Sequence, residues 1–172
     1  MQNLNIWFKR KFRFDFPVEL YPMVVERLRG TPIRLEGKLR DLDQATLTRS
    51  LPGGWSVQQQ AGHLVVLESL WIGRLDDFLK GEKTLRAADL ENRQTKQTDF
   101  HAQPISEILS QFRSARTGLV ERLYQLNLEQ AGMVALHPRL NQPMRLIDAF
   151  HFVAEHDDHH LARMTDLINA RE

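Results

Sequence analysis

Four long stretches of this 172-residue chain repeat apolar residues at spacings of three and four, which is the periodicity of one face of an α-helix. The clearest begins at Ser56, a favourable helix cap, and ends at Gly81; its apolar positions are Val57, Leu64, Leu67, Trp71, Leu75 and Phe78. Another begins at Pro104 and carries Ile105, Ile108, Phe112, Leu119 and Leu123. A last one covers about 144–170, and we find no β-strand of usable length.

The first helical stretch, between residues 17 and 43, is interrupted. Residues 17–29 carry Leu20, Met23, Val24 and Leu28, and residues 32–43 carry Ile33, Leu35, Leu39 and Leu42. The letters GTP at 30–32 separate the two runs, and Pro22 can delay the start of the first. The pattern predicts either one broken helix or two short ones.

Four amphipathic segments in a chain of this size predict an all-α fold, a four-helix bundle, in a single domain over residues 1–172. The connection at 81–103, between the second and third helices, is polar and too long for a simple hairpin, although a short helix can lie inside it. It can carry the chain back along the bundle and make those two helices parallel. Residues 1–16, with the basic letters FKRKFRF at 8–14, are expected to form a solvated N-terminal arm.

The composition excludes several classes of protein. The chain has no cysteine, so it has no disulfide framework, no cysteine zinc site and no thiol nucleophile of its own. Its net charge of +1 gives no overall field that would attract nucleic acid, and no apolar stretch is long enough to cross a membrane. The N-terminus lacks the apolar run of a secretion signal, which makes the cytoplasm the expected compartment.

Four of the seven histidines lie between residues 150 and 160, on the closing helix. His156 and His160 are four residues apart and share one face. That face continues as an apolar stripe formed by Ala149, Phe152, Val153, Met164 and Leu167. The two imidazoles are therefore predicted to point into the core, where an unpaired polar group is costly. His159 lies about 100° away around the helix.

A third histidine, His63, lies on the second helix among Val66, Leu67 and Leu70, again on an apolar face. Two interpretations of the three inward histidines stay open. They can be hydrogen-bonded core residues, or they can share one divalent ion as neutral imidazoles. Three histidine ligands would leave one position for water or substrate, which is the pattern of a catalytic metal site.

The remaining histidines are weaker candidates. His101 and His137 lie in connections, where exposure to solvent is the default, and His151 points elsewhere on the closing helix. Three acidic residues of that helix are candidates to orient an imidazole, with solvation as the expected role of at least two: Glu155, Asp157 and Asp158.

Three stretches together resemble the DinB-like superfamily of small helical proteins, and in particular its YfiT-like branch of bacillithiol S-transferase-like proteins. They are FDFPVELYPMVVERLRGTPIRLEGKLRDL near the start, LPGGWSVQQQAGHLVVLESLWIGRL around His63, and FVAEHDDHHLARM near the end. The resemblance covers nearly the whole chain and rests on the order and spacing of the three motifs. It implies a four-helix bundle whose two middle helices are parallel.

The resemblance also implies a metal site. Its ligands would be one histidine of the second helix and the two closing ones, which are His63, His156 and His160 here, with zinc or nickel as the usual metal. A homodimer is the implied assembly. This chain departs from the pattern twice. Gln60 replaces a glutamate that relatives often carry, which would remove an orienting partner, and Arg163 replaces a further histidine of the closing motif, which leaves the substrate open.

Characterised relatives transfer a low-molecular-weight thiol to an electrophile. The resemblance therefore implies a metal-dependent enzyme that acts on a small molecule through a metal-bound thiolate. Arg163, one turn beyond His160, can pair with a carboxylate of the thiol, with a solvated surface position as the alternative. His159 is the other candidate catalytic residue. A hydrolase that uses metal-bound water and a dimeric metal-binding protein without turnover are the alternatives.

Overall fold

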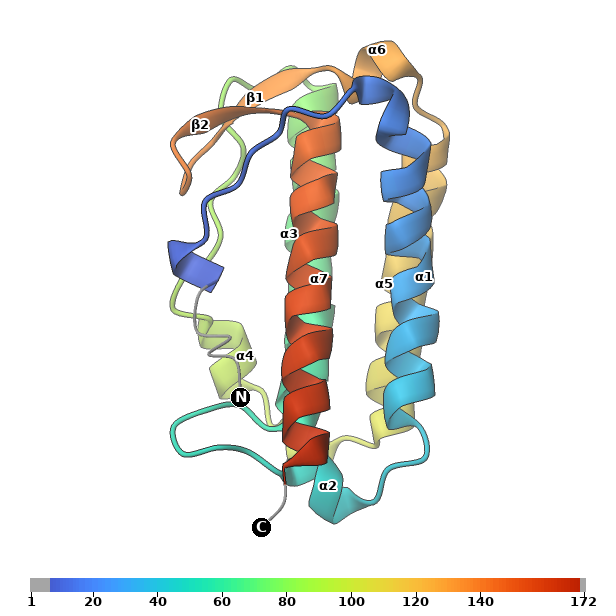
Figure 1. The fold of residues 1–172 in the computed structure, drawn as a ribbon, viewed down its shortest axis with the longest axis vertical. Coiled ribbons are helices and arrows are strands. Elements are labelled where there is room, and N and C mark those ends of the chain that lie inside the picture. The colour runs from blue at the N-terminus through green and yellow to red at the C-terminus, as the bar shows by residue number, and fades with distance from the viewer. Residues whose placement is uncertain (1–6, 171–172) are drawn as a thin grey trace.

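The structure is a computed structural model that describes residues 7–170, and four long helices dominate it (Figure 1). The long helices are α1 (Tyr21–Leu39), α3 (Val57–Leu79), α5 (Ile105–Tyr124) and α7 (Leu146–Asn169). Helices α1 and α3 each pack against both α5 and α7. The expected four-helix bundle is confirmed. No helix within residues 7–170 combines the length and the apolar composition needed to cross a membrane.

The connection between α3 and α5 sets the topology. Helices α3 and α5 run in the same direction, from the end near α2 to the end near α6, whereas α1 and α7 run the other way (Figure 1). Between α3 and α5 the chain returns along the bundle and forms α4 (Arg93–Gln97) and η3 (Phe100–Ala102). The parallel arrangement expected from this long link is therefore confirmed.

Short elements cover the two ends of the bundle. They are η2 (Val18–Leu20), α2 (Gln44–Thr48), α6 (Leu128–Ala131), β1 (Val134–His137) and β2 (Gln142–Arg145). A further short element, η1 (Trp7–Lys9), lies beside α7, where Trp7 packs on Phe152 and His156. The antiparallel β1–β2 hairpin corrects the expectation that the chain has no strand, and its pair Ala135 and Met144 is buried. Strands of four residues, one of them with Pro143 on it, are too short to show an alternating pattern.

Helix α1 is one continuous helix, although its sequence pattern is interrupted. Pro32 lies inside it and lacks the N–H that would bind the carbonyl of Leu28. The guanidinium of Arg116, from α5, donates to that carbonyl over 3.5 Å and partly replaces the missing bond. The predicted break is wrong because a buried side chain from another helix meets the unpaired carbonyl. Three residues assigned to the apolar stripe of residues 17–43 are exposed: Leu20, Met23 and Ile33.

Helix α3 begins and ends as its sequence predicts. The Ser56 hydroxyl accepts a hydrogen bond from the Gln59 N–H, and the Gln59 side chain accepts one from the Ser56 N–H, which is a capping box. At the other end Gly81 has a φ of 73°, a left-handed conformation that glycine adopts at little cost. These two ends fix the position of His63 along the bundle.

A buried polar layer separates two apolar clusters of the core. The cluster towards the hairpin includes Leu28, Trp71 and Phe150, and the cluster towards α2 includes Leu35 and Phe112. Every long helix crosses from one cluster to the other, and the chain places buried polar residues at each crossing: Thr31, Glu68, Arg116, His156, Asp157 and His160.

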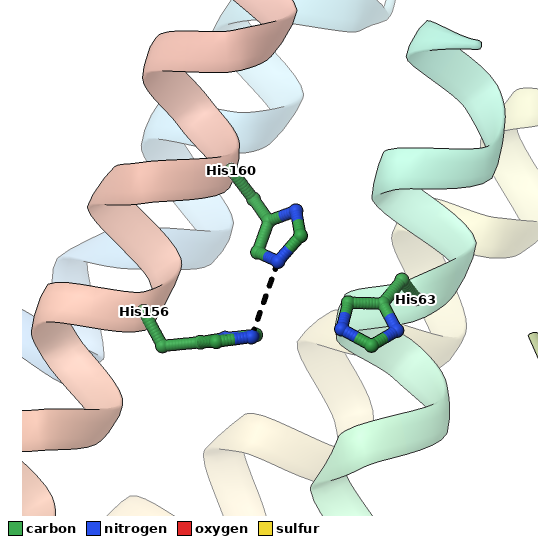
Figure 2. Close-up of side chains that lie close together, drawn as sticks. All are labelled: His63, His156 and His160. Carbon is green, nitrogen blue, oxygen red and sulfur yellow. Dashed lines mark hydrogen bonds between the residues drawn. The ribbon is translucent and has the colours of Figure 1, made fainter. Parts of the chain in front are cut away.

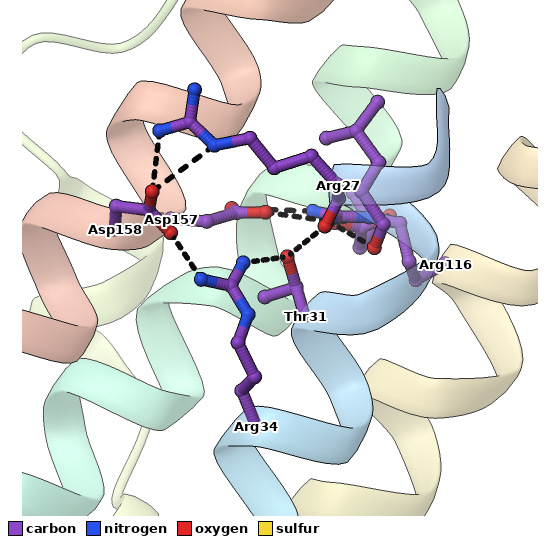
Figure 3. Close-up of polar contacts among 8 residues, drawn as sticks. Arg27, Thr31, Arg34, Arg116, Asp157 and Asp158 are labelled. Carbon is purple, nitrogen blue, oxygen red and sulfur yellow. Dashed lines mark hydrogen bonds and ion pairs between the residues drawn. The ribbon is translucent and has the colours of Figure 1, made fainter. Parts of the chain in front are cut away.

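The centre of this layer is an ion-pair triad (Figure 3). Arg116 Nη1 lies 2.5 Å from Asp157 Oδ2, and Arg116 Nη2 lies 2.6 Å from Glu68 Oε1. Burial opposes the charge of Arg116, but the attraction of Asp157 and Glu68 outweighs it and raises the pKa of Arg116. Because Asp157 directly follows His156, this triad holds α7 in register beside α3 and α5.

Residues 7–16 lie along the bundle rather than free in solvent (Figure 1). The rings of Phe12 and Phe152 are 4.9 Å apart, and Arg10 forms an ion pair with Glu155 on α7. The intervening basic side chains Lys11 and Arg13 are exposed. The described part of the expected N-terminal arm is therefore a strap across α7; residues 1–6 lie outside the described residues.

Candidate metal centre

Three histidines from two helices converge in the polar layer (Figure 2). His63 comes from α3, and His156 and His160 come from successive turns of α7. One nitrogen of each ring lies within 4.8 Å of the others, and the Nε2 atoms of His156 and His160 are 3.1 Å apart. All three side chains are buried. The structure thus brings together the three residues that the sequence pattern singles out.

Two neighbouring side chains orient these rings. Gln60 Oε1 lies 2.5 Å from His160 Nδ1, and because a carboxamide oxygen only accepts, Nδ1 carries the proton and Nε2 keeps its lone pair. Thr95 Oγ1, on α4, lies 2.9 Å from Nδ1 of His63. The expectation that Gln60 removes an orienting partner is wrong, since its amide oxygen supplies the acceptor that a carboxylate would supply.

The cluster is electrically neutral at neutral pH. Burial lowers the pKa of His63 to about 4, and the nearby His159 adds to this effect. Burial also lowers the pKa of His156 and of His160 far below the usual value, with the neighbouring imidazoles adding to it. Neutral imidazoles are the form that binds metal ions, so the site needs no deprotonation to do so.

The donor set fits a divalent metal. His156 Nδ1 is buried without a hydrogen-bond partner, and its Nε2 faces the lone pair of His160 Nε2. With the proton of His156 on Nδ1, the two Nε2 lone pairs face each other, and a cation near both Nε2 atoms would remove that repulsion. Tetrahedral zinc with Zn–N bonds of about 2.0–2.1 Å places ligand nitrogens roughly 3.3 Å apart. The Nε2 atoms of His156 and His160 are 3.1 Å apart, and all three ligand nitrogens lie within 4.8 Å of one another.

A cavity of about 310 Å³ opens beside the three histidines. Its wall is mostly aromatic and apolar. It includes the three histidines of the cluster and, beside them, Trp7, Trp55, Leu67, Trp71 and Phe152. The candidate catalytic residues His159 and Arg163 line the same cavity. A small molecule in this space would reach the histidines, so the arrangement offers both ligands and an accessible open position.

The other histidines are placed as follows. His101 is exposed, as expected, and its Nε2 lies 2.8 Å from the Ser56 hydroxyl. His137 is buried at 2% exposure, which corrects the expectation of a solvated loop position, because the β1–β2 hairpin folds it against Arg74. His151 is half-buried and packs on Phe16, away from the triad.

The three acidic residues of α7 form ion pairs with arginines and do not contact the three histidines. Asp157 binds Arg116, and Asp158 binds Arg27 and Arg34 (Figure 3). Glu155 binds Arg10 and Arg27. None of the hydrogen bonds described for these carboxylates reaches His63, His156 or His160. Ion pairing with arginines on neighbouring helices, rather than solvation or imidazole orientation, is their role in the structure.

Sequence reasoning named Gln60 but missed three other residues around the three histidines. Gln60 lies three residues before His63 and so on the same face, a spacing that does indicate its place beside the site. Thr95 and the two aromatic residues Trp7 and Trp55 come from segments outside the long helices, and no periodicity predicts them. The rings of Trp55 and His63 are 4.6 Å apart, and those of Trp7 and His156 are 5.3 Å apart.

Comparisons with known proteins agree with this fold. YfiT from Bacillus subtilis, described as a probable metal-dependent hydrolase with an unusual four-helix bundle topology, has a similar structure with a TM-score of 0.80 and 23% sequence identity. The match covers 92% of this chain and 91% of that one, and at this identity it shows the fold. Curated protein sequences give no significant match. The family model of the DinB superfamily matches residues 27–164, and the chain therefore belongs to that superfamily.

Proposed function

We propose that this protein is a metal-dependent enzyme in which His63, His156 and His160 bind one divalent metal ion, zinc or nickel. The observation that carries the proposal is the convergence of three buried, neutral imidazoles beside a cavity. The description of YfiT as a probable metal-dependent hydrolase supports the same assignment. When bound, the metal would act as a Lewis acid that lowers the pKa of a thiol or a water molecule in its open position.

The residues of the chain prepare the site for this chemistry. Gln60 fixes the tautomer and the ring orientation of His160, and Thr95 holds the ring orientation of His63. Trp7 and Trp55 pack against the cluster and limit the access of bulk water to it. We assign His159 and Arg163 to contact the bound small molecule, because both line the cavity beside the triad.

Transfer of a low-molecular-weight thiol to an electrophile is the reaction that we favour. In this reaction the thiol sulfur forms a bond to an electrophilic carbon, the leaving group departs with the bonding electrons, and the thiol proton passes to solvent. The chain has no cysteine, so the sulfur must come from a separate thiol that the cavity binds. Arg163 would attract an anionic group on that thiol.

Hydrolysis is the second candidate, and the description of YfiT is the observation that favours it. The same ligands would then serve a reaction that adds water to an ester or amide and needs no thiol. A metal-binding homodimer without turnover is the third. The homodimer itself stays a prediction, and sedimentation of the untagged protein at several concentrations measures it.

Activity assays separate these candidates. The metal-loaded wild type is offered a panel of cellular thiols with a model electrophile, and ester and amide substrates without thiol, beside the metal ion alone and a His156→Ala variant. A rate that depends on added thiol and is lost in the variant supports transfer, whereas thiol-independent turnover supports hydrolysis. No rate above that of the metal ion alone, in either assay, contradicts an enzymatic role.

A further inference from the structure

Two arginines line the end of the cavity that lies farthest from His63 along α3, and neither is paired with a carboxylate of the described residues. Arg74 lies on α3 and is 5% exposed, and Arg139 lies in the turn of the β1–β2 hairpin and is half-buried. Both line the cavity. Among the described residues, no carboxylate lies within ion-pair distance of either guanidinium. Asp77, which attracts Arg74, accepts hydrogen bonds from the backbone and the guanidinium of Arg86.

Both guanidinium groups line one cavity and repel each other. Burial and the repulsion of Arg139 and Arg86 outweigh the attraction of Asp77 and lower the pKa of Arg74 to about 10. Burial also lowers the pKa of Arg139, whose guanidinium carbon lies 5.6 Å from the ring centroid of Phe152. Two like charges placed together in a desolvated wall repel each other, and an anion between them would relieve that repulsion.

This part of the wall also has more hydrogen-bond donors than acceptors. Trp71 Nε1 and Arg139 Nη2 are buried without a partner. Arg74 Nη1 lies 3.1 Å from His137 Nε2, and the Leu140 N–H donates to His137 Nδ1. A neutral imidazole offers one acceptor, so one of these two donors is unmatched. Unmatched buried donors are costly, and an oxyanion supplies the acceptors that they lack.

The same wall adjoins the histidine cluster. The Arg74 guanidinium carbon lies 5.4 Å from the Trp71 ring, and the Trp71 ring lies 5.8 Å from that of His156, so one indole separates the arginine from the triad. The apolar surface between them is formed by Leu67, Leu70, Trp71 and Phe152. A molecule with an anionic end at the arginines and an apolar body would present its other end to the histidines.

We propose that Arg74 and Arg139 bind the carboxylate of a small organic acid, which is the substrate class of this cavity. This assignment rests on the proposed function, because it places the acid's reactive end beside the histidine triad. A planar carboxylate matches the paired N–H groups of a guanidinium, and a single negative charge suits a wall that also includes Asp89. A cavity of about 150 Å³ holds benzene, so about 310 Å³ has room for a ring and a short acid chain.

Calorimetric titration of chelator-treated, metal-free protein tests the proposal. The probes are acetate, butanoate, benzoate and 3-phenylpropanoate, with 3-phenylpropanamide as the uncharged match of the last and phenylphosphonate as a different oxyanion. We expect 3-phenylpropanoate to bind at least about tenfold more tightly than its amide. Equal affinity for acid and amide, no measurable binding of any carboxylate, or tighter binding of phenylphosphonate would overturn the proposal.

Four variants locate the binding site. Arg74→Met removes the charge and keeps most of the side-chain volume. Arg139→Gln removes the charge at a half-buried position, where the fold tolerates a substitution more easily. Each should weaken binding of 3-phenylpropanoate by about tenfold or more and leave the amide nearly unchanged. Arg122→Gln, at an arginine of α5 that pairs with Asp76 outside the cavity, should keep the affinity for the acid. Arg163→Gln removes the other arginine that lines the cavity, and loss of affinity in that variant alone would contradict the proposal.

A comparison with zinc-loaded protein separates this proposal from the metal assignment. Carboxylate binding that depends on Arg74 and Arg139 in protein that takes up no metal would support the anion site while the proposed function fails. Carboxylate binding that appears only after zinc is added, and that is insensitive to both arginine variants, would show that the acid binds the metal instead. That result would overturn the arginine site and leave the metal site standing.

Discussion

At the scale of single residues, the ring of His160 depends on one amide. Gln60 Oε1 accepts the Nδ1–H of His160 and so directs Nε2 toward His156 and the shared site. An acceptor of this kind fixes a ligand's tautomer and raises its basicity, and its loss typically weakens metal binding by about 10–100-fold. The chain has the amide of Gln60 where relatives often have a carboxylate. The amide oxygen still accepts from His160, but it brings no negative charge to the site.

We therefore expect Gln60→Leu to weaken zinc binding by about 10–100-fold with little change in helix content, and Gln60→Glu to bind zinc at least as tightly as the wild type. Competition with a chromogenic chelator measures both affinities. Gln111→Leu, at an exposed position of α5, is the matched control and should bind zinc like the wild type. Equal affinity for Gln60→Leu and the wild type would show that the amide does not orient His160.

At the scale of elements, the long link is docked on α3 by close packing. A Cβ built on Gly62 would lie 2.4 Å from the Phe100 ring, and Gln58 Nε2 donates to the carbonyls of Phe100 and Gln103 over 2.6 Å each. The same link carries Thr95 to His63. The missing side chain at Gly62, next to His63, is what lets the link approach.

We expect Gly62→Ala to destabilise the protein by about 1–3 kcal/mol, because the methyl group overpacks against Phe100. It should also weaken zinc binding, since the link that carries Thr95 shifts. Gly118→Ala is the control in α5, where an added Cβ meets nothing within 4 Å, and it should stabilise by about 0.5–1 kcal/mol. Urea unfolding measures both, and a neutral Gly62→Ala would contradict tight docking of the link.

The ion-pair triad is the second feature at this scale, because it joins α3, α5 and α7 at the layer that contains the histidines (Figure 3). Arg116→Met would leave Glu68 and Asp157 buried without their shared cation, and we expect it to cost about 3–5 kcal/mol of stability. Arg122→Ala removes a partly exposed ion pair with Asp76 and should cost less than about 1 kcal/mol. Equal unfolding midpoints for the two variants would contradict a structural role for the triad.

At the scale of the whole molecule, the buried histidines link stability to pH. The folded pKa of His63 is about 4, and that of an unfolded histidine is about 6.5. Between these values the unfolded chain binds more protons, so stability is complete above pH 6.5 and falls as the pH approaches 4. The lowered pKa of His63 alone should reduce the free energy of unfolding by about 2 kcal/mol at pH 5. The pKa values of His156, His160 and His137 are also lowered, so these residues add to the loss.

Urea unfolding of metal-free protein between pH 7.5 and pH 5 measures this dependence. We expect the midpoint to fall as the pH is lowered, and His63→Gln, which cannot take up a proton, to fall less steeply. Added zinc should oppose the loss as long as the histidines stay neutral, because it binds the folded state. A midpoint that does not change over this range would contradict the burial of neutral imidazoles.

Much of the fold follows from the sequence, because long helices repeat their apolar positions often enough to be recognised. The cap at Ser56, the end at Gly81 and the parallel course of α3 and α5 are predicted correctly. The hairpin and the continuity of α1 are not. Both depend on contacts with distant segments, such as the Arg116 guanidinium at the carbonyl that Pro32 leaves unpaired.

The candidate site likewise has residues that the sequence predicts and residues that it does not. The facing histidines of α3 and α7 are visible as polar residues on apolar stripes. His137 is expected to be exposed in a connection, yet the β1–β2 hairpin buries it and half-buries Arg139 in the cavity wall. Thr95 reaches His63 only because the link folds back, and no local pattern indicates that return.

The central claim is that the three histidines hold a metal, and metal content tests it most directly. Untagged wild type, His63→Ala, His156→Ala and, as a control inside the cavity, His159→Ala are purified and analysed by elemental mass spectrometry before and after incubation with zinc or nickel. We expect about one metal ion per chain in the wild type and in His159→Ala, and its loss in the other two variants. A wild type that takes up neither metal, or triad variants that keep it, would contradict the account.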